Sequence, residues 1–233
     1  MKVKICGIFR EQDIDYINEA RPDYCGFVFA ESKRQVSAAQ AARLRQRLAE
    51  GIAAVGVFVN APIENITALY RDGVINIAQL HGDEDEEYIA QLKEASGNTP
   101  IPVIQVIKSS SFKSLTQRHG EHKDHKENSN FNSPCPPCPL CLRERSSKVN
   151  TTDYYLLDSG AGSGKAFDWG LLNSLNIDKP WFLAGGINLD NIKQAMAINP
   201  FGIDISSGAE TDGVKDREKI LQLVSTIRKE KTV

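Results

Sequence analysis

The segment AVGVFVNAPIENITALYRDGVINIAQL, residues 54–80, contains the pattern that is most informative about the fold. It begins with the apolar run AVGVFV and ends with the apolar run IAQL, and neither run shows a regular alternation with polar residues. Continuous runs of this kind indicate strands that are buried on both faces. Between them, apolar side chains recur at the spacing of one helix face: Ile63, Ile66, Leu69 and Tyr70. The segment therefore predicts a strand, a helix and a second strand parallel to the first.

The same pattern continues along the rest of the chain. Six further apolar runs predict strands: VKIC at 3–6, YCGFVF at 24–29, PVIQVI at 102–107, YYLLD at 154–158, WFLAG at 181–185 and GIDIS at 202–206. Helical spacing recurs between runs, at Tyr88, Ile89 and Leu92 and again at Ile220, Leu223, Val224 and Ile227. Strands that alternate with helices in this way predict an α/β fold, with a parallel sheet closed into a single (β/α)8 TIM barrel over residues 1–233.

One connection is longer than the others. The interval between the predicted strand ends at residues 107 and 158 is about twice that of a compact strand-helix unit. Residues 109–150 are rich in Ser, Asn, Lys and Glu, and hold four of the ten prolines and three of the four histidines. This composition predicts a disordered, low-complexity insertion after the fifth strand. Phe112 and Leu115 are the remnant of a helical pattern at its start.

A zinc site in this insertion is the alternative, because the segment gathers soft metal ligands: His119, His122, His125, Cys135, Cys138 and Cys141. A structural zinc site needs four ligands on a shaped turn. In the sequence CPPCPLC, prolines fill three of the four spacer positions and restrict that turn. The disordered insertion is therefore favoured, and no metal is predicted.

Composition narrows the classes of function and location. The chain is 41% hydrophobic and 25% charged, with a net charge of -2, so it lacks the positive field that nucleic acid or an anionic membrane requires. The N-terminus lacks the apolar core of a signal peptide, and no window has the length of a membrane span. Five cysteines is an odd number, and Cys6 and Cys25 lie in strand-like runs. We expect a cytoplasmic protein with reduced thiols and neither nucleic-acid nor membrane partners.

Small residues gather after the last three predicted strands. The ends of parallel barrel strands carry the active site, and a phosphate often binds beside the last two strands. Glycine lets backbone N–H groups approach such an anion closely. Any one of these glycines could simply form a tight turn, but their recurrence at neighbouring strand ends favours phosphate binding by Gly162, Ser163, Gly164, Gly185, Gly186, Ser206, Ser207 and Gly208.

Blocks at the predicted strand ends resemble the phosphoribosylanthranilate isomerase family. The blocks occur in order along the chain, which matches this family except at 109–150: KICGI at 4–8, GFVFAESKRQVS at 26–37, VGVFVN at 55–60, QLHGDE at 79–84, LLDS with GSGKAFDW at 156–169, AGGIN with Asn191 at 184–191, and DISSGAE at 204–210. So many ordered blocks make a chance match very improbable.

The resemblance implies an enzyme of tryptophan biosynthesis. Its reaction is the Amadori rearrangement of N-(5-phosphoribosyl)anthranilate to 1-(2-carboxyphenylamino)-1-deoxyribulose 5-phosphate, without a cofactor or metal. By the family pattern, Cys6 is the general base and Asp158 the general acid, and Arg34 binds the anthranilate part of the substrate. Gln79, His81 and Asp204 line the substrate pocket. The expected partner is this small phosphorylated substrate, bound by a monomer or a homodimer.

The expected roles of Cys6 and Asp158 require neighbouring groups that shift the pKa of each side chain. A free thiol has a pKa of about 8.5, so a thiolate base needs nearby positive charge or amide dipoles, and we expect the phosphate loops to supply only dipoles. Asp158 must carry a proton when it acts, which requires burial or a neighbouring carboxylate such as Asp204. The planar guanidinium of Arg34 suits the carboxylate of anthranilate.

Each residue also has a simpler interpretation. Cys6 could be a buried structural thiol, Asp158 a turn residue and Arg34 a solvated surface side chain. For His81, a structural role is favoured over catalysis. Two other functions are the alternatives. The isomerase of histidine biosynthesis has a carboxylate where Cys6 stands, and a non-catalytic, phosphate-binding barrel would leave Cys6, Arg34 and Asp158 unexplained.

Overall fold

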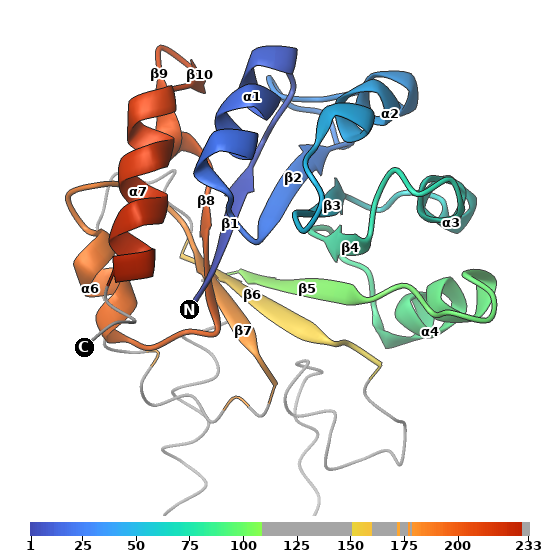
Figure 1. Cartoon of the computed structure of the whole chain (residues 1–233). Coiled ribbons are helices and arrows are strands. Elements are labelled where there is room, and N and C mark those ends of the chain that lie inside the picture. Colours follow the sequence, from blue (N-terminus) through green and yellow to red (C-terminus); the bar gives the residue numbers. More distant parts are fainter. Residues whose placement is uncertain (109–150, 160–171, 173–176, 178, 230–233) are drawn as a thin grey trace, which may run out of the picture.

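The fold is a closed barrel of parallel strands in the order of the sequence (Figure 1). The structure, a computed structural model, describes residues 1–108, 151–159, 172, 177 and 179–229. The barrel strands are β1 (Lys2–Cys6), β2 (Tyr24–Val28), β3 (Ala53–Phe58), β4 (Ile77–Leu80), β5 (Val103–Lys108), β6 (Tyr154–Asp158), β7 (Trp181–Ala184) and β8 (Gly202–Ile205). The predicted (β/α)8 barrel is confirmed, and every predicted strand end agrees with the structure to within one residue.

Helices cover the outside of this barrel (Figure 1). Those in the described residues are α1 (Glu11–Ala20), α2 (Ala38–Arg47), α3 (Ile63–Arg71), α4 (Glu86–Ala95), α6 (Ile192–Ala197) and α7 (Arg217–Lys229). The apolar stripes that predicted α3, α4 and α7 supply their buried residues, such as Ile66, Ile89 and Leu223. No helix of the described residues is long and apolar enough to cross a membrane. Phe112, Leu115 and the whole segment 109–150 lie outside the described residues.

Strands β5 and β6, which precede and follow the long segment 109–150, pair directly in the barrel wall. β5 and β6 pair in parallel from Ile104 opposite Tyr154 to Lys108 opposite Asp158. This register sets the end of β6 beside the end of β5 at the same rim of the barrel. The connection between the two strands therefore does not interrupt the wall that positions Asp158.

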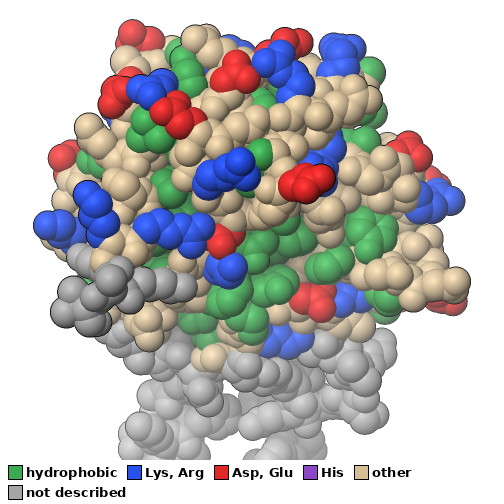
Figure 2. Space-filling model, in the orientation of Figure 1, with side chains coloured by type: hydrophobic (Ala, Val, Ile, Leu, Met, Phe, Trp, Pro, Cys, Tyr) green, Lys and Arg blue, Asp and Glu red, His purple; other side chains and the backbone are tan. Residues whose placement is uncertain are grey.

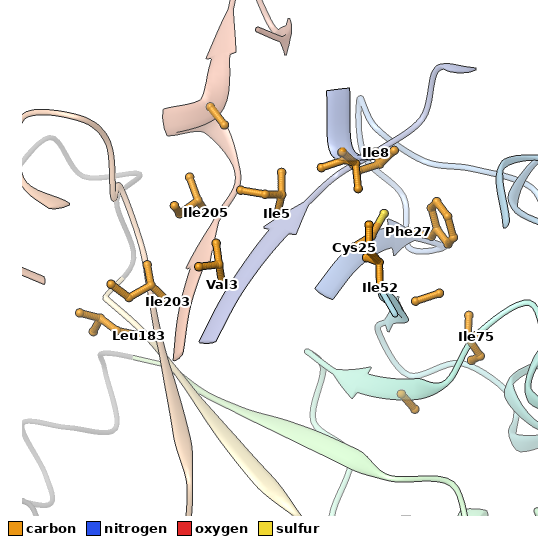
Figure 3. Packing of buried hydrophobic residues seen from close by; sticks show 14 of the residues in the cluster. Val3, Ile5, Ile8, Cys25, Phe27, Ile52, Ile75, Leu183, Ile203 and Ile205 are labelled. Atoms are coloured by element: carbon orange, nitrogen blue, oxygen red, sulfur yellow. The ribbon is translucent and has the colours of Figure 1, made fainter. Parts of the chain in front are cut away.

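Side chains alternate between the outside of the barrel and its interior. On β1, Val3 and Ile5 join the outer core beneath the helices, close to Ile203 and Ile205 of β8 (Figure 3). Lys4 and Cys6 face the opposite way, into the barrel, because successive side chains of a strand point to opposite faces. The interior below the pocket is filled by an apolar cluster: Val55, Ile77, Ile104, Leu156, Phe182 and Ala184, with Tyr24, Val106, Tyr154 and Phe201 against it.

A small irregular unit follows β8. It consists of a short 3-10 helix, η4 (Ser207–Ala209), and an antiparallel hairpin of β9 (Glu210–Thr211) and β10 (Val214–Lys215).

On the face that Figure 2 draws, positive and negative side chains are interspersed over the surface. Cys6 and Cys25 are both buried and free.

Candidate active site

A pocket opens among the carboxyl ends of the barrel strands, where such barrels carry their active sites. Its volume is about 410 Å³, which suits a small-molecule ligand. The structure brings most of the candidate residues to this one pocket: Cys6, Arg34, Gln79, His81, Asp158, Gly185, Gly186, Asp204, Ser206, Ser207 and Gly208. The remaining candidates, Gly162, Ser163 and Gly164, lie outside the described residues.

Cys6 ends β1 and has room in the pocket because Gly26 faces it in register on β2. A Cβ atom on Gly26 would lie 2.7 Å from the Cys6 Sγ, so any larger residue there would displace the thiol. The Cys6 side chain is almost fully buried. Burial raises the pKa of the thiol, whereas the positive charges of Lys4 and Lys215 lower it, and the pKa remains above its ordinary value.

Lys4 supplies a positive charge that the sequence analysis did not anticipate. Its side chain is 0% exposed, and its Nζ donates to Asp204 Oδ2 at 2.9 Å. The two residues face each other in register on β1 and β8. The positive charge that a thiolate base requires is thus supplied by Lys4, on the same strand face as Cys6, and not by the phosphate loops.

Asp158 ends β6 and lies close to His81, which follows β4. The distance from His81 Nε2 to Asp158 Oδ2 is 3.6 Å, and both side chains are partly exposed to the pocket. Burial lowers the pKa of His81 more than the charge of Asp158 raises it, so the imidazole is neutral at neutral pH. A neutral imidazole can donate one hydrogen bond to the carboxyl group without forming a full ion pair.

Arg34 is anchored by Glu210 of β9. Its Nε and Nη2 donate to the two carboxylate oxygens of Glu210 at 2.7 and 2.6 Å, a bidentate pair. Glu210 is held in turn by Lys215, whose Nζ donates to Glu210 Oε1 at 2.5 Å and to the Ser206 carbonyl at 2.9 Å. Burial raises the pKa of Glu210, but the hydrogen bonds from Arg34 and Lys215 outweigh it and hold the pKa below its ordinary value.

The loops after β7 and β8 contact each other through glycine. A Cβ atom on Gly208 would lie 1.8 Å from the Ile187 carbonyl oxygen, so no other residue fits this contact. Gly185 and Gly186 have φ values of 100° and 64°, a backbone region that favours glycine. Asn191 fixes the first loop, since its Nδ2 donates to the Gly186 carbonyl and its Oδ1 accepts from the Asn188 N–H. The pocket is thus bordered by exposed backbone on the side of β7 and β8.

Two buried polar atoms line the interior of this pocket. Within the described part of the chain, Gln79 Oε1 and Asp204 Oδ1 are buried and have no hydrogen-bond partner. Buried acceptors without a partner cost free energy unless a ligand or water satisfies them. Across the same described residues, no group of three or more His, Cys, Asp or Glu side chains could hold a metal ion.

Comparison with known proteins identifies the family. The sequence model of the family described as N-(5'phosphoribosyl)anthranilate (PRA) isomerase matches residues 3–131 and 139–226. The chain belongs to this family. It is accordingly an enzyme of the isomerase class, and the match is interrupted only inside the segment 109–150.

Relatives in the phosphoribosylanthranilate isomerase family match nearly the full chain. The N-(5'-phosphoribosyl)anthranilate isomerase of Endomicrobium trichonymphae is 39% identical over 97% of this chain and 98% of its own. The crystal structure of phosphoribosyl anthranilate isomerase from Thermotoga maritima is 30% identical, with a TM-score of 0.75 over 98% of this chain and 99% of that one. Another isomerase structure, in complex with reduced 1-(o-carboxyphenylamino)-1-deoxyribulose 5-phosphate, is 29% identical with a TM-score of 0.74, over 98% of this chain and 99% of that one.

The family blocks in the sequence contain residues whose roles the sequence analysis missed. Lys4 stands in KICGI and Glu210 ends DISSGAE, but neither was assigned a function. For Lys4, the sequence offered one signal: a charged side chain within the strand-like apolar run VKIC. A charge in such a run is expected to be buried and to need a partner. Lys215 gave no such signal, since its hairpin is too short to show a periodic pattern.

Proposed function

We propose that this isomerase of tryptophan biosynthesis catalyses the Amadori rearrangement of N-(5-phosphoribosyl)anthranilate to 1-(2-carboxyphenylamino)-1-deoxyribulose 5-phosphate. Cys6 is the general base and Asp158 the general acid. The observation that carries the proposal is that a thiol at the end of β1 and a carboxyl group at the end of β6 line one pocket. An aldose-to-ketose isomerisation needs one acid and one base on either side of the sugar.

The reaction begins with ring opening. Asp158 donates a proton to the furanose ring oxygen, the C1–O bond breaks, and the nitrogen lone pair forms an iminium at C1. The Cys6 thiolate then removes the proton from C2, and the electrons of that C–H bond neutralise the iminium to give an enolamine. Protonation at C1 and loss of the proton from the C2 hydroxyl yield the ketone. His81, 3.6 Å from Asp158, can donate a hydrogen bond to the carboxylate that remains after the first step.

Arg34 binds the carboxylate of the anthranilate ring. A guanidinium group carries five N–H donors in one plane, and two of them are occupied by Glu210. The remaining donors can form hydrogen bonds with a second carboxylate in that plane. Glu210 thereby fixes the orientation in which Arg34 meets the substrate.

The phosphate binds to the loops after β7 and β8, where Gly185, Gly186, Ser206, Ser207 and Gly208 border the pocket. Backbone N–H groups in loops of this kind bind anions, and serine hydroxyls add donors. Gly162, Ser163 and Gly164 are expected to contribute from the loop after β6. Gln79 and Asp204, with their unpaired buried oxygens, can accept hydrogen bonds from the sugar hydroxyls.

The test is the loss of phosphoribosylanthranilate fluorescence on addition of the purified protein. We expect wild-type activity, and a loss of at least about a hundredfold in kcat for Cys6→Ser and for Asp158→Asn. Cys25→Ala is the matched control, because Cys25 is a buried thiol on β2 that faces away from the pocket. Full activity in both pocket variants would contradict the assigned roles, and an inactive wild-type protein would contradict the function.

A further inference from the structure

Lys4 is a charged residue in the barrel interior that the proposed mechanism does not yet use. It lies two residues before Cys6 on β1, so both side chains face the inside of the barrel. Its side chain is 0% exposed. A buried ammonium group costs free energy unless it is paired, so its presence in the barrel interior calls for a reason.

The contacts of Lys4 connect the thiol to a carboxylate. Its Nζ donates to Asp204 Oδ2 at 2.9 Å, and its positive charge lowers the pKa of the Cys6 thiol, which lies two residues along the same face of β1. Lys215 forms its hydrogen bonds with other groups, since its Nζ donates to Glu210 and to the Ser206 carbonyl. Of the two lysines, Lys4 therefore lowers the pKa of the thiol more than Lys215 does.

The positive charges around Cys6 offset part of the cost of burying its thiolate form. The charged groups that act on it from neighbouring elements are Lys4 on β1, Arg34 after β2, Asp204 on β8 and Lys215 on β10, whereas Cys25 of β2 lies in the outer core. Among these described residues, three cations are balanced by two carboxylates, Asp204 and the Glu210 that binds Arg34 and Lys215. One positive charge is left over, and a thiolate at Cys6 would neutralise it.

We infer that Lys4 is a positioning residue of the proposed isomerase, whose ammonium group stabilises the thiolate form of Cys6 and is itself oriented by Asp204. The inference rests on the proposed function and adds an electrostatic partner to its general base. Burial raises the pKa of the thiol, the charge of Lys4 lowers it and the charge of Asp204 raises it. Removing the charge of Lys4 should therefore raise the pKa of the thiol, and removing the charge of Asp204 should lower it.

The experiment measures how alkylation of Cys6 by iodoacetamide depends on pH, with the modified residue quantified by peptide mass spectrometry. Only the thiolate reacts, so the midpoint of the rate profile reports the pKa of this thiol. We expect the midpoint to rise by at least about one pH unit in Lys4→Met and to stay near the wild-type value in Lys4→Arg. In Asp204→Asn we expect it to fall.

The pH dependence of enzyme activity should change in parallel with the pKa of the Cys6 thiol. In Lys4→Met, kcat/KM near neutral pH should fall by about tenfold or more and recover in part at alkaline pH, because less of the base is ionised. Lys2→Met is the matched control, since Lys2 is on the same strand but pairs with Asp23 at the other end of the barrel. Its thiol midpoint and kcat/KM should equal those of the wild type.

An unchanged midpoint in a folded Lys4→Met variant would overturn the inference, even if that variant lost activity. If Lys4→Met does not fold, Asp204→Asn decides: a lowered midpoint supports the inference, and an unchanged or raised midpoint overturns it. Alkylation does not require turnover, so its outcome is separate from that of the proposed function. An inactive wild-type enzyme would overturn the function, whereas a normal wild-type enzyme with unaltered thiol titration in the variants would overturn only the role of Lys4.

Discussion

At the scale of the residue, the pocket depends on small side chains and on paired charges around a few reactive groups. Gly26 leaves the space that the Cys6 Sγ occupies, and Glu210 holds the guanidinium of Arg34 in one plane. Neither residue needs to touch the substrate. Both fix the position of a side chain that we propose contacts the substrate, and a displacement of about 1 Å is enough to reduce a catalytic rate severely.

Replacing Gly26 should therefore impair catalysis through geometry. In Gly26→Ala, the new methyl group would meet the Cys6 Sγ at 2.7 Å and push the thiol out of position. We expect kcat to fall by about tenfold or more in steady-state fluorescence assays, with a cooperative thermal transition retained. Unaltered kcat in a folded Gly26→Ala protein would show that the close packing around Cys6 is not needed.

Replacing Glu210 should impair substrate binding more than turnover. Glu210→Gln removes the charge that fixes Arg34, so the anthranilate carboxylate should bind less tightly. We expect KM to rise by about tenfold while kcat changes less, because the substitution leaves the acid and the base in place. The comparison variant is Arg34→Met, which should raise KM at least as much. A fall in kcat at constant KM would argue against this role for Glu210.

At the scale of the element, single carboxylates join strands and helices that are distant in the sequence. Asp23, just before β2, accepts from Lys2 Nζ at 2.8 Å, from the Val3 N–H at 2.9 Å and from Arg228 Nη2 of α7 at 2.7 Å. Burial raises the pKa of Asp23, but these donors outweigh it and lower the pKa below its ordinary value of 3.8. One side chain thus links β1, β2 and the C-terminal helix.

The stability supplied by Asp23 should depend on pH with a defined sign. Because its folded pKa is lowered, its contribution is present above its ordinary pKa and is lost as the pH falls through the folded pKa. Asp23→Asn should reduce the free energy of unfolding by about 1–3 kcal/mol near neutral pH. Urea unfolding should show that this difference shrinks in strongly acidic solution. A difference that stays constant down to that range would contradict the assignment.

The strands and the long helices could be predicted because each has a periodic pattern of its own. The stripe of Ile63, Ile66 and Leu69 is complete within one helix and needs no knowledge of its neighbours. The hairpin of β9 and β10 could not be predicted in this way, since its strands have two residues each. Its position depends on Lys215 and Glu210, which meet only in the folded chain.

At the scale of the whole molecule, the site forms because the barrel closes. Lys4 and Asp204 are 200 residues apart in sequence and face each other only because β1 pairs with β8. Residues that end strands, such as Cys6 and Asp158, could be assigned to the pocket from sequence, because parallel strands present their carboxyl ends at one rim. The pairing of Lys4 with Asp204 could not, because no local pattern sets the register between the first and last strands.

The long connection between β5 and β6 should be dispensable for the chemistry. The two strands pair directly, and residues 109–150 have a composition poor in apolar side chains. We expect deletion of residues 118–148 to leave kcat within a few-fold of the parent enzyme, measured by the same fluorescence assay. A loss of several orders of magnitude would mean that this segment helps to build the site.

In the proposed mechanism, the Cys6 thiol and the Asp158 carboxyl group act on one sugar from two sides of the same pocket. A crystal structure of this protein with reduced 1-(o-carboxyphenylamino)-1-deoxyribulose 5-phosphate measures that arrangement directly. We expect sugar C2 to lie about 3.5 Å from Cys6 Sγ, and the C4 hydroxyl, formerly the ring oxygen, to lie about 3 Å from the Asp158 carboxyl group. A ligand bound with its sugar out of reach of either group would contradict it.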